Sequence, residues 1–160
     1  MTRSIESVAV IGAGTMGAGI AAASAAAGCR VLILDMNQET IEAALQQVDE
    51  ENRHLVTAGL VDTDLEAVSE YDWICEAVVE DLAVKRDLFS RLEEVRKDGS
   101  VISSNTSGIP LRQISEGMPE RFRSDVAITH FFNPVKVMRL FELVPGEDTC
   151  LLYTSPSPRD

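Results

Sequence analysis

The chain has 160 residues, of which 45% are hydrophobic and 25% are charged, so it is long enough for one domain with a buried core. Its 14 Lys and Arg residues against 26 Asp and Glu residues give a net charge of −12, which argues against nucleic acid or an anionic membrane as the main partner. The cysteines Cys29, Cys75 and Cys150 have neither metal-ligand nor redox spacing, and an odd number is typical of a reducing compartment. We find no secretory leader pattern and no apolar stretch long enough to span a bilayer. These features predict a soluble, cytoplasmic α/β protein without a metal site.

Short apolar runs alternate with helical patterns along the chain, which is typical of βαβ units with a mostly parallel sheet. We expect strands at residues 7–11, 30–34, 71–77, 100–103, 126–129 and 140–144. We expect an Ala-rich helix that follows a glycine-rich turn at 12–17 and ends at Gly28, and further helices over 37–57, 81–95 and 110–114. In the second of these helices Asn37 is the expected N-cap, and His54 lies on the polar face with no predicted role. Trp73 and Cys75 are expected in the core.

The last residues, 150–160 (CLLYTSPSPRD), show no periodicity, and their Ser-Pro repeats can extend neither a helix nor a sheet. All of them can be back-translated in frame into an adapter of transposase-based sequencing libraries. The alternative is a native Pro/Ser linker. We therefore expect a native domain over residues 1–149, incomplete at its C-terminal end, in a protein that continues beyond it.

The turn after the first predicted strand has the pattern G-x-G-x-x-G, with Gly12, Gly14 and Gly17 at its fixed positions. These glycines permit a tight turn, the approach of a pyrophosphate to the backbone, and close packing of helix on strand. Asp35 ends the next predicted strand, where a carboxylate can bind ribose hydroxyls, and neither Lys nor Arg follows it closely. The pattern predicts NAD rather than NADP, although glycine-rich turns also occur as purely structural loops.

Polar residues gather where the later predicted strands end: EAVVEDLAVK at 76–85, SSNTS at 103–107, HFFNP at 130–134, and Glu142 inside an apolar strand. In open α/β sheets, ligands bind at the carboxyl ends of the strands. His130 has the side chain best suited to move a proton at neutral pH, and a carboxylate on its far ring nitrogen would fix the tautomer. The spacing from His130 to Glu142 allows a strand, a turn and a return strand to bring the two together.

With GAGTMGAGIA, the strand-end Asp35 and THFFNPVKVMRLFELV, these pieces span about residues 7–145. The sequence resembles the NAD-binding domain of the (3S)-3-hydroxyacyl-CoA dehydrogenases of fatty-acid β-oxidation. The resemblance implies a Rossmann-type, doubly wound, mostly parallel sheet with flanking helices, and NAD-dependent oxidation of 3-hydroxyacyl-CoA to 3-oxoacyl-CoA. It implies that His130 is the general acid/base, that Glu142 holds its imidazole, and that Ser107 donates to the substrate oxygen. By the same resemblance, the NAD site would comprise Gly12, Gly14, Met16, Gly17, Asp35, Val78, Val79, Glu80, Lys85, Ser107 and Asn133.

The family has a second, helical domain that closes the substrate cleft and forms the dimer, and this domain is absent from the sequence. We therefore expect the chain to bind NAD with little turnover, and its source to be a homodimer or part of a multifunctional β-oxidation protein. The alternatives are a related hydroxyacid or carnitine dehydrogenase, and a non-catalytic NAD-binding module like the lens-crystallin relatives of the family.

Single residues also have structural alternatives. Considered alone, a histidine such as His130 is more often a structural residue whose hydrogen bonds are made within the protein, and a glutamate such as Glu142 is more often an outward-facing charge on an edge strand. Ser107 is also a candidate N-cap for the helix near Pro110, and Lys85 a candidate solvated helix cation.

Overall fold

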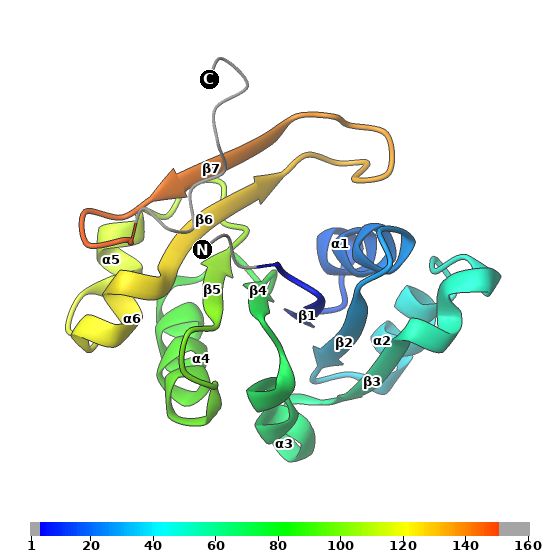
Figure 1. Ribbon diagram of the computed structural model, residues 1–160, viewed down its shortest axis with the longest axis horizontal. Helices are drawn as coiled ribbons and strands as arrows, with labels where there is room; N and C mark the ends of the chain where they lie inside the picture. Colours follow the sequence, from blue (N-terminus) through cyan, green and yellow to red (C-terminus); the bar gives the residue numbers. More distant parts are fainter. Residues whose placement is uncertain (1–3, 151–160) are drawn as a thin grey trace.

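The fold is a single sheet with helices on both faces, seen in a computed structural model that describes residues 4–150 (Figure 1). The strands are β1 (Ser7–Ile11), β2 (Arg30–Asp35), β3 (Val56–Leu60), β4 (Trp73–Glu76), β5 (Val101–Ser104), β6 (Val126–Phe131) and β7 (Phe141–Pro145). Their order in the 7-stranded sheet is β3-β2-β1-β4-β5-β6-β7. Every neighbouring pair is parallel except β6 and β7, which are antiparallel. The expected Rossmann-type α/β class is confirmed.

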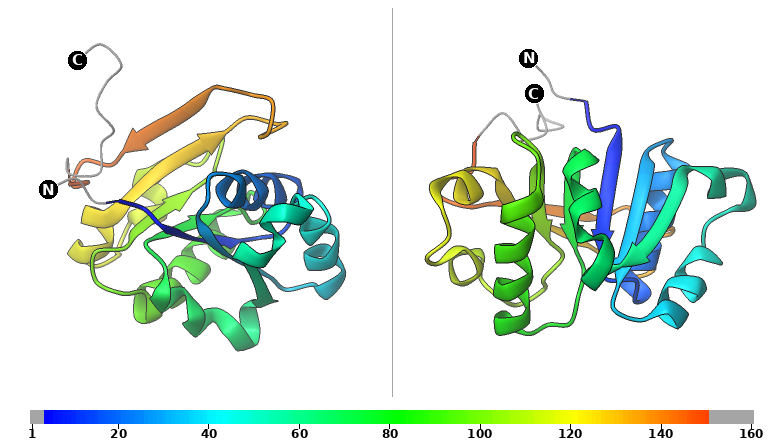
Figure 2. Two further views of the ribbon diagram at one scale, coloured as in Figure 1. Left: turned by 45° about the vertical axis from the view of Figure 1, so that its right-hand side comes forward. Right: turned by 90° about the horizontal axis from the view of Figure 1, so that it is seen from below.

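The helices cover the two faces of the sheet, as the views in Figure 2 show. They are α1 (Thr15–Ala26), α2 (Gln38–Leu45), α3 (Val61–Asp64), α4 (Leu82–Val95), α5 (Leu111–Ser115) and α6 (Glu120–Asp125), with two 3₁₀ helices, η1 (Glu50–Leu55) and η2 (Leu65–Glu70). One core cluster joins α1 and α2 to the sheet, and a second joins α4, α5 and α6 to its other face. The strand residues alternate between the two clusters, since successive side chains point to opposite faces.

Strand β1 lies between β2 and β4, so the chain leaves β1 in one direction and later returns to its other side. The loops after β1 and β4 therefore diverge at the carboxyl ends of neighbouring strands, which is where such sheets bind ligands. The glycine-rich turn follows β1 directly at this point, and Gly12 N–H donates to Leu34 O of β2 at 2.7 Å.

The helix expected over residues 37–57 is wrong in its second half. Asn37 does cap α2, and its side chain accepts hydrogen bonds from Glu39 N and Thr40 N. The helix ends at Leu45, however, and after η1 the chain enters β3, whose Val56 pairs with Val31 of β2. The apolar positions at helical spacing reflect burial rather than one continuous helix, because Ile41 and Val48 pack in the same core cluster although Val48 lies beyond α2. His54 therefore lies, exposed, on η1 rather than on the polar face of a long helix.

The other expected elements agree with the structure to within a few residues. Gly28, with φ +86°, lies just beyond the end of α1 as expected, since a left-handed residue commonly follows a helix. Cys75 is fully buried, and Trp73 packs partly buried against the α1 side of the core. Besides β3, the elements α3, η2 and α6 were not expected from the sequence.

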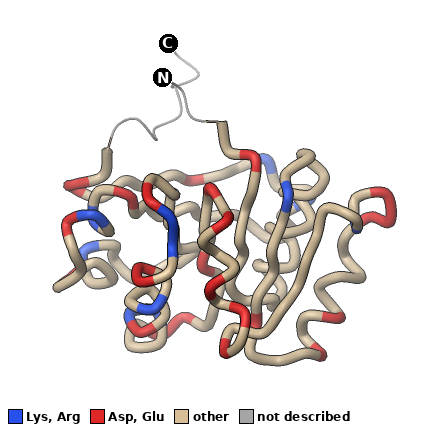
Figure 3. The backbone as a smooth tube through the Cα atoms, turned by 60° about the horizontal axis from the view of Figure 1, so that its bottom comes forward, with Lys and Arg blue, Asp and Glu red and all other residues tan. Residues whose placement is uncertain are grey.

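Acidic residues are spread across the molecule, with the basic residues mostly interspersed among them (Figure 3). Many basic side chains form ion pairs, among which Arg96 is the most buried and joins Glu93 of α4 to Asp125 of α6. Across residues 4–150, no helix combines the length and the apolar character needed to cross a membrane.

Candidate functional site

The glycine-rich turn is built so tightly that two of its glycines have no room for a side chain. Gly12 has φ +103°, and a Cβ there would lie 2.5 Å from Ala77 O in the segment after β4. A Cβ on Gly17 would lie 1.7 Å from Gly12 O, so only glycine lets α1 start this close to β1. Gly14 differs, because nothing lies within 4 Å of the position its Cβ would take. The space that a side chain would need is thus filled by backbone atoms at Gly12 and Gly17 and is open at Gly14.

The open side of the turn coincides with the start of α1, of which Gly14 is the N-cap. No side chain caps this helix, and its first turn has no acidic residue. The amides at a helix N-terminus carry a partial positive charge that favours phosphate groups. The open space at Gly14, beside the N-terminus of a helix that has no acidic side chain in its first turn, fits the pyrophosphate of a dinucleotide.

Asp35 at the end of β2 is held by two backbone amides. Its Oδ2 accepts from Ala13 N at 2.7 Å and its Oδ1 from Asn37 N at 2.9 Å. The carboxylate therefore lies beside the turn, in the place where a ribose would be bound. The next residues, Met36, Asn37 and Gln38, are exposed and include no cation that would compensate a 2′-phosphate. These contacts fit NAD better than NADP.

A buried ion pair lies behind the loop after β4. Lys85 Nζ of α4 is 2.7 Å from Glu76 Oε1 of β4, and the two side chains are 1% and 0% exposed. Glu76 Oε1 also accepts from Val78 N at 2.7 Å, and Oε2 accepts from Ser104 Oγ at 2.5 Å. The alternative that Lys85 is a solvated helix cation is wrong, because burial without partners would be costly and Glu76 supplies the opposite charge.

Glu80 connects this pair to the loop after β5. Its Oε2 lies 3.4 Å from Lys85 Nζ, while Oε1 accepts from the Thr106 hydroxyl and from the amides of Ser107 and Gly108, both at 3.2 Å. Although burial opposes the charged form, the hydrogen bonds from Thr106 and Gly108 and the charge of Lys85 lower the pKa of Glu80 below its ordinary value. Glu80 is thus an anion that fixes the backbone of the Ser107 loop.

The structure brings His130 and Glu142 together across the antiparallel pair β6 and β7. The two residues are directly opposite each other in the register, and His130 Nδ1 lies 2.8 Å from Glu142 Oε2. The side chains are 20% and 53% exposed, so the pair is reachable from solvent. Glu142 lies on the edge strand β7, as the structural alternative predicts, but its side chain faces His130. With Nδ1 bound, the other ring nitrogen, Nε2, is the atom suited to exchange a proton with a ligand.

Of the remaining predicted site residues, Met16 lies in the first turn of α1, and the others lie in loops that follow strands. Ser107 is exposed, and it is not a helix cap, since the N-cap of α5 is Pro110 and Ile109 N donates to Thr106 Oγ1. Met16 and Val78 are half-buried, whereas Val79 and Asn133 are exposed. The loops follow β4, β5 and β6, and α1 follows the turn after β1, so all of these residues lie near the carboxyl ends of parallel strands.

Three residues that connect these strand ends were not predicted individually from the sequence: Glu76, Ser104 and Asn105. Asn105 Oδ1 accepts from Phe131 N at 2.9 Å, and Asn105 N donates to Glu76 O at 2.8 Å. A charged residue at the end of the apolar run of β4 was the available signal for Glu76, because such a side chain requires a buried partner. The chain offered no comparable signal for Asn105.

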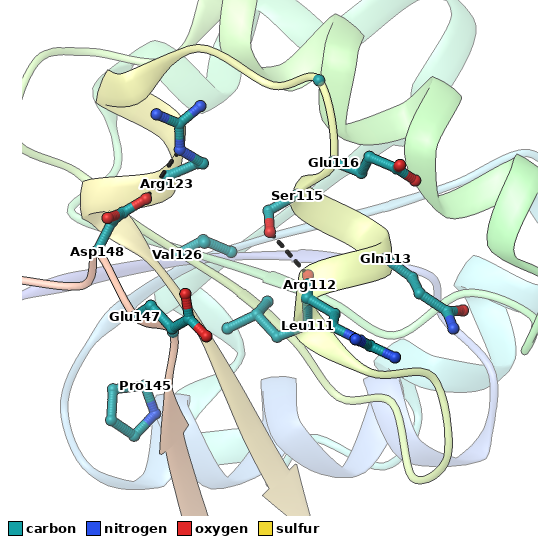
Figure 4. Close-up of a pocket in the computed structure, with 12 residues that line it drawn as sticks. Leu111, Arg112, Gln113, Ser115, Glu116, Arg123, Val126, Pro145, Glu147 and Asp148 are labelled. Atoms are coloured by element: carbon teal, nitrogen blue, oxygen red, sulfur yellow. Dashed lines mark hydrogen bonds and ion pairs between the residues drawn. The ribbon is translucent and has the colours of Figure 1, made fainter.

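A cavity of about 550 Å³ lies away from these residues, between α5, the region of α6 and the turn after β7 (Figure 4). Leu111, Arg123 and Asp148 are among its lining residues, and Arg123 Nε lies 2.9 Å from Asp148 Oδ2. None of the predicted cofactor or catalytic residues lines it. Within residues 4–150, no cluster of His, Cys, Asp and Glu side chains is arranged to hold a metal ion.

Comparison with known proteins agrees with this geometry. Residues 7–151 match the family described as 3-hydroxyacyl-CoA dehydrogenase, NAD binding domain. A probable 3-hydroxyacyl-CoA dehydrogenase of Bacillus subtilis is 35% identical over 93% of this chain and 23% of its own length. A putative fatty acid oxidation complex trifunctional enzyme of Rickettsia felis is 34% identical over 90% of this chain and 22% of its own length. The crystal structure of 3-hydroxybutyryl-CoA dehydrogenase from Escherichia coli K12 superposes with a TM-score of 0.83 and 33% identity, covering 93% of this chain and 34% of that one.

Proposed function

Because the chain belongs to the 3-hydroxyacyl-CoA dehydrogenase family, whose NAD-binding domain it matches, we propose that its source protein oxidises (3S)-3-hydroxyacyl-CoA to 3-oxoacyl-CoA with NAD. The chain spans between 22% and 34% of the three relatives described above, so the proposed activity belongs to the complete protein. The single observation that carries the proposal is the His130–Glu142 pair at the end of the sheet that also holds the glycine-rich turn. A domain that only bound NAD would have no need of it.

In the proposed reaction His130 Nε2 removes the proton of the substrate 3-hydroxyl. Glu142 holds Nδ1 and stabilises the imidazolium that forms. Ser107 donates a hydrogen bond to the substrate oxygen from a loop that Glu80 fixes. When bound, NAD supplies the hydride acceptor, so the alcohol loses one hydride from C3 and one proton from oxygen.

The NAD site would be formed by Gly12, Gly14, Met16, Gly17, Asp35, Val78, Val79, Glu80, Ser107 and Asn133. Because Lys85 is buried, it would act on this site through its ion pair with Glu80 rather than by contacting the cofactor directly. Open space at Gly14 and the fixed carboxylate of Asp35 support this assignment.

The catalytic role is tested with His130→Gln in the complete source protein. We expect oxidation of 3-hydroxybutyryl-CoA to fall by about a thousandfold, because general base and oriented hydrogen bond are lost together, while NAD affinity stays within about twofold. His54→Gln, on the exposed η1, is the matched control and should retain full activity. Unchanged turnover in His130→Gln would exclude the role.

Two alternatives are separated by other measurements. Carnitine and a sugar acid, offered beside 3-hydroxyacyl-CoA substrates of several lengths, distinguish a related hydroxyacid dehydrogenase. A non-catalytic module would bind NAD and oxidise none of these compounds.

The assignment of residues 150–160 to a sequencing adapter is tested by reading the source DNA past the codon for Thr149. A frame that continues into a helical domain supports it, and a stop codon after Asp160 contradicts it.

Compartment and assembly are part of the proposal at a coarser level. Relatives of this chain include multifunctional fatty-acid oxidation enzymes, and we propose that the source protein is a cytoplasmic homodimer or one part of such an enzyme. Size-exclusion chromatography with light scattering on the complete protein distinguishes the two.

A further inference from the structure

The ladder between β5 and β6 ends before it reaches His130. Its last pair is Ser104 with Ile128, whereas β6 continues to Phe131. On its other side, β6 stays paired with β7 through Phe131. His130 therefore lies where the backbone of β6 has lost its β5 neighbour, on the side from which the Ser107 loop departs.

Asn105 fills this gap with its side chain. Its Oδ1 accepts the hydrogen bond from Phe131 N–H at 2.9 Å, directly after His130. Its own backbone N–H donates to Glu76 O of β4 at 2.8 Å. One residue thus ties the ends of β4 and β6 together, and its amide oxygen takes the place that a carbonyl of a longer β5 would occupy.

The same residue begins the loop that carries Ser107. Ser107 follows it by two positions, and Glu80 holds the far side of the loop through the amides of Ser107 and Gly108. The Asn105–Phe131 hydrogen bond is accordingly a direct link between the loop of Ser107 and the strand of His130. A shift of either segment would change the distance between the two proposed catalytic groups.

We propose that Asn105 is a positioning residue that sets His130 relative to Ser107 through its hydrogen bond to the amide of Phe131. The inference rests on the proposed function for the roles of His130 and Ser107. It requires an acceptor oxygen at position 105 and makes no use of the amide NH₂ group. Asn105→Asp keeps such an oxygen, while Asn105→Leu keeps the approximate shape and removes it.

The hydrogen bond can be examined by NMR on this chain without any activity. In Asn105→Leu, the Phe131 amide should exchange with solvent at least about tenfold faster than in the parent chain, because its acceptor is gone. In Asn105→Asp, exchange should stay within about threefold of the parent rate. The chain has only 2 histidines, so the imidazole signal of His130 should shift in the Leu variant while that of exposed His54 serves as internal reference. Asn52→Leu, on η1, is the matched control and should change neither the exchange rate of the Phe131 amide nor the imidazole signal of His130.

In the complete protein, Asn105→Leu should lower kcat by about tenfold to a hundredfold, with KM for NAD within about twofold, because misplacement affects the reacting groups more than the cofactor site. Asn105→Asp should recover most of kcat. The proposal is overturned if Phe131 exchange is unchanged in the Leu variant, or if Asp and Leu impair kcat equally. Should the Leu variant not fold, loss of Phe131 protection in the Asp variant overturns it equally.

Failure of the proposed function gives a different result. In that case the unmodified complete protein oxidises no 3-hydroxyacyl-CoA, whereas the exchange of Phe131 still responds to Leu and not to Asp.

Discussion

His130 and Glu142 face each other across β6 and β7, with Nδ1 and Oε2 2.8 Å apart. Their alignment comes from the register of the antiparallel pair itself. Because opposite residues in such a register are fixed neighbours, a carboxylate at position 142 is placed to hold an imidazole at position 130. The sheet therefore supplies both the turn for a dinucleotide and an oriented histidine.

We predict that Glu142→Gln in the complete source protein lowers kcat by about a hundredfold, while NAD affinity stays within about twofold. The amide keeps a hydrogen-bonding group beside Nδ1 but loses the charge that stabilises the imidazolium. Steady-state kinetics and NAD titration measure the two quantities. Glu94→Gln, at an exposed position of α4, is the control and should match the parent protein. Equal kcat in the two variants would exclude a role for the Glu142 charge.

Two glycines of the turn should respond in opposite ways to the same substitution. Gly14→Ala should leave the midpoint of thermal unfolding within about 2 °C of the parent, since its Cβ meets nothing within 4 Å, but should weaken NAD binding at least about tenfold. Gly17→Ala should destabilise the fold by about 3 kcal/mol or more, because its Cβ would lie 1.7 Å from Gly12 O. Calorimetry for both properties tests the pair. Tight NAD binding by Gly14→Ala would contradict the site assignment.

The buried partner of Glu76 should matter far more than an exposed lysine. Lys85→Met should lower the free energy of unfolding by about 3 kcal/mol, because it leaves the Glu76 carboxylate buried without its counter-charge. Lys136→Met, which removes an exposed ion pair with Asp49, should change it by less than about 0.5 kcal/mol. Urea denaturation of the two variants gives the comparison. Similar losses in both would show that the Glu76–Lys85 pair is not required for the fold.

Asp72 should contribute stability near neutral pH that the fold loses in acid. Burial opposes its charged form, but hydrogen bonds from Lys97, the Glu6 amide and Ser7 lower the pKa of Asp72 from 3.8 to about 2. Since the folded-state pKa is depressed, the stabilisation is complete above the unfolded value and is lost as the pH falls from about 4 to about 2. Asp72→Asn should therefore cost about 1–2 kcal/mol at pH 7 and flatten the decline of stability in that acid range.

Urea denaturation at a series of pH values measures this dependence. Asp62→Asn, at an exposed carboxylate 3.8 Å from Arg91, is the control and should keep the parent profile. An Asp72→Asn profile parallel to that of the parent would contradict the assignment.

Most strands and the turn were predictable because local signals specify them: buried apolar runs for β1 and β2, and glycines at fixed spacing for the turn. Strand β3 was not, since Val56–Leu60 is short and half-exposed, and its strand character depends on pairing with β2 rather than on periodicity. The helix predicted over residues 37–57 was wrong beyond Leu45 for a related reason, because the chain there passes through η1 and its last two residues, Val56 and Thr57, pair with β2.

The site shows the same division between local and non-local signals. His130, Glu142 and Asp35 were predicted as site residues from their residue type and their place at the end of or within an expected strand, and the family resemblance implied their roles. The burial of Lys85 depends on how α4 packs beside Glu76 of the sheet, and the hydrogen bond of Asn105 to the Phe131 amide joins residues 26 positions apart, so no local pattern predicts either.

The proposed dehydrogenase activity can be measured by following NADH formation when the unmodified complete protein is mixed with (3S)-3-hydroxybutyryl-CoA and NAD. We predict NADH in an amount equal to the 3-oxoacyl-CoA formed, with the (3R) isomer and NADP giving far slower reactions. Binding of NAD without any oxidation of (3S)-3-hydroxyacyl-CoA substrates would contradict it.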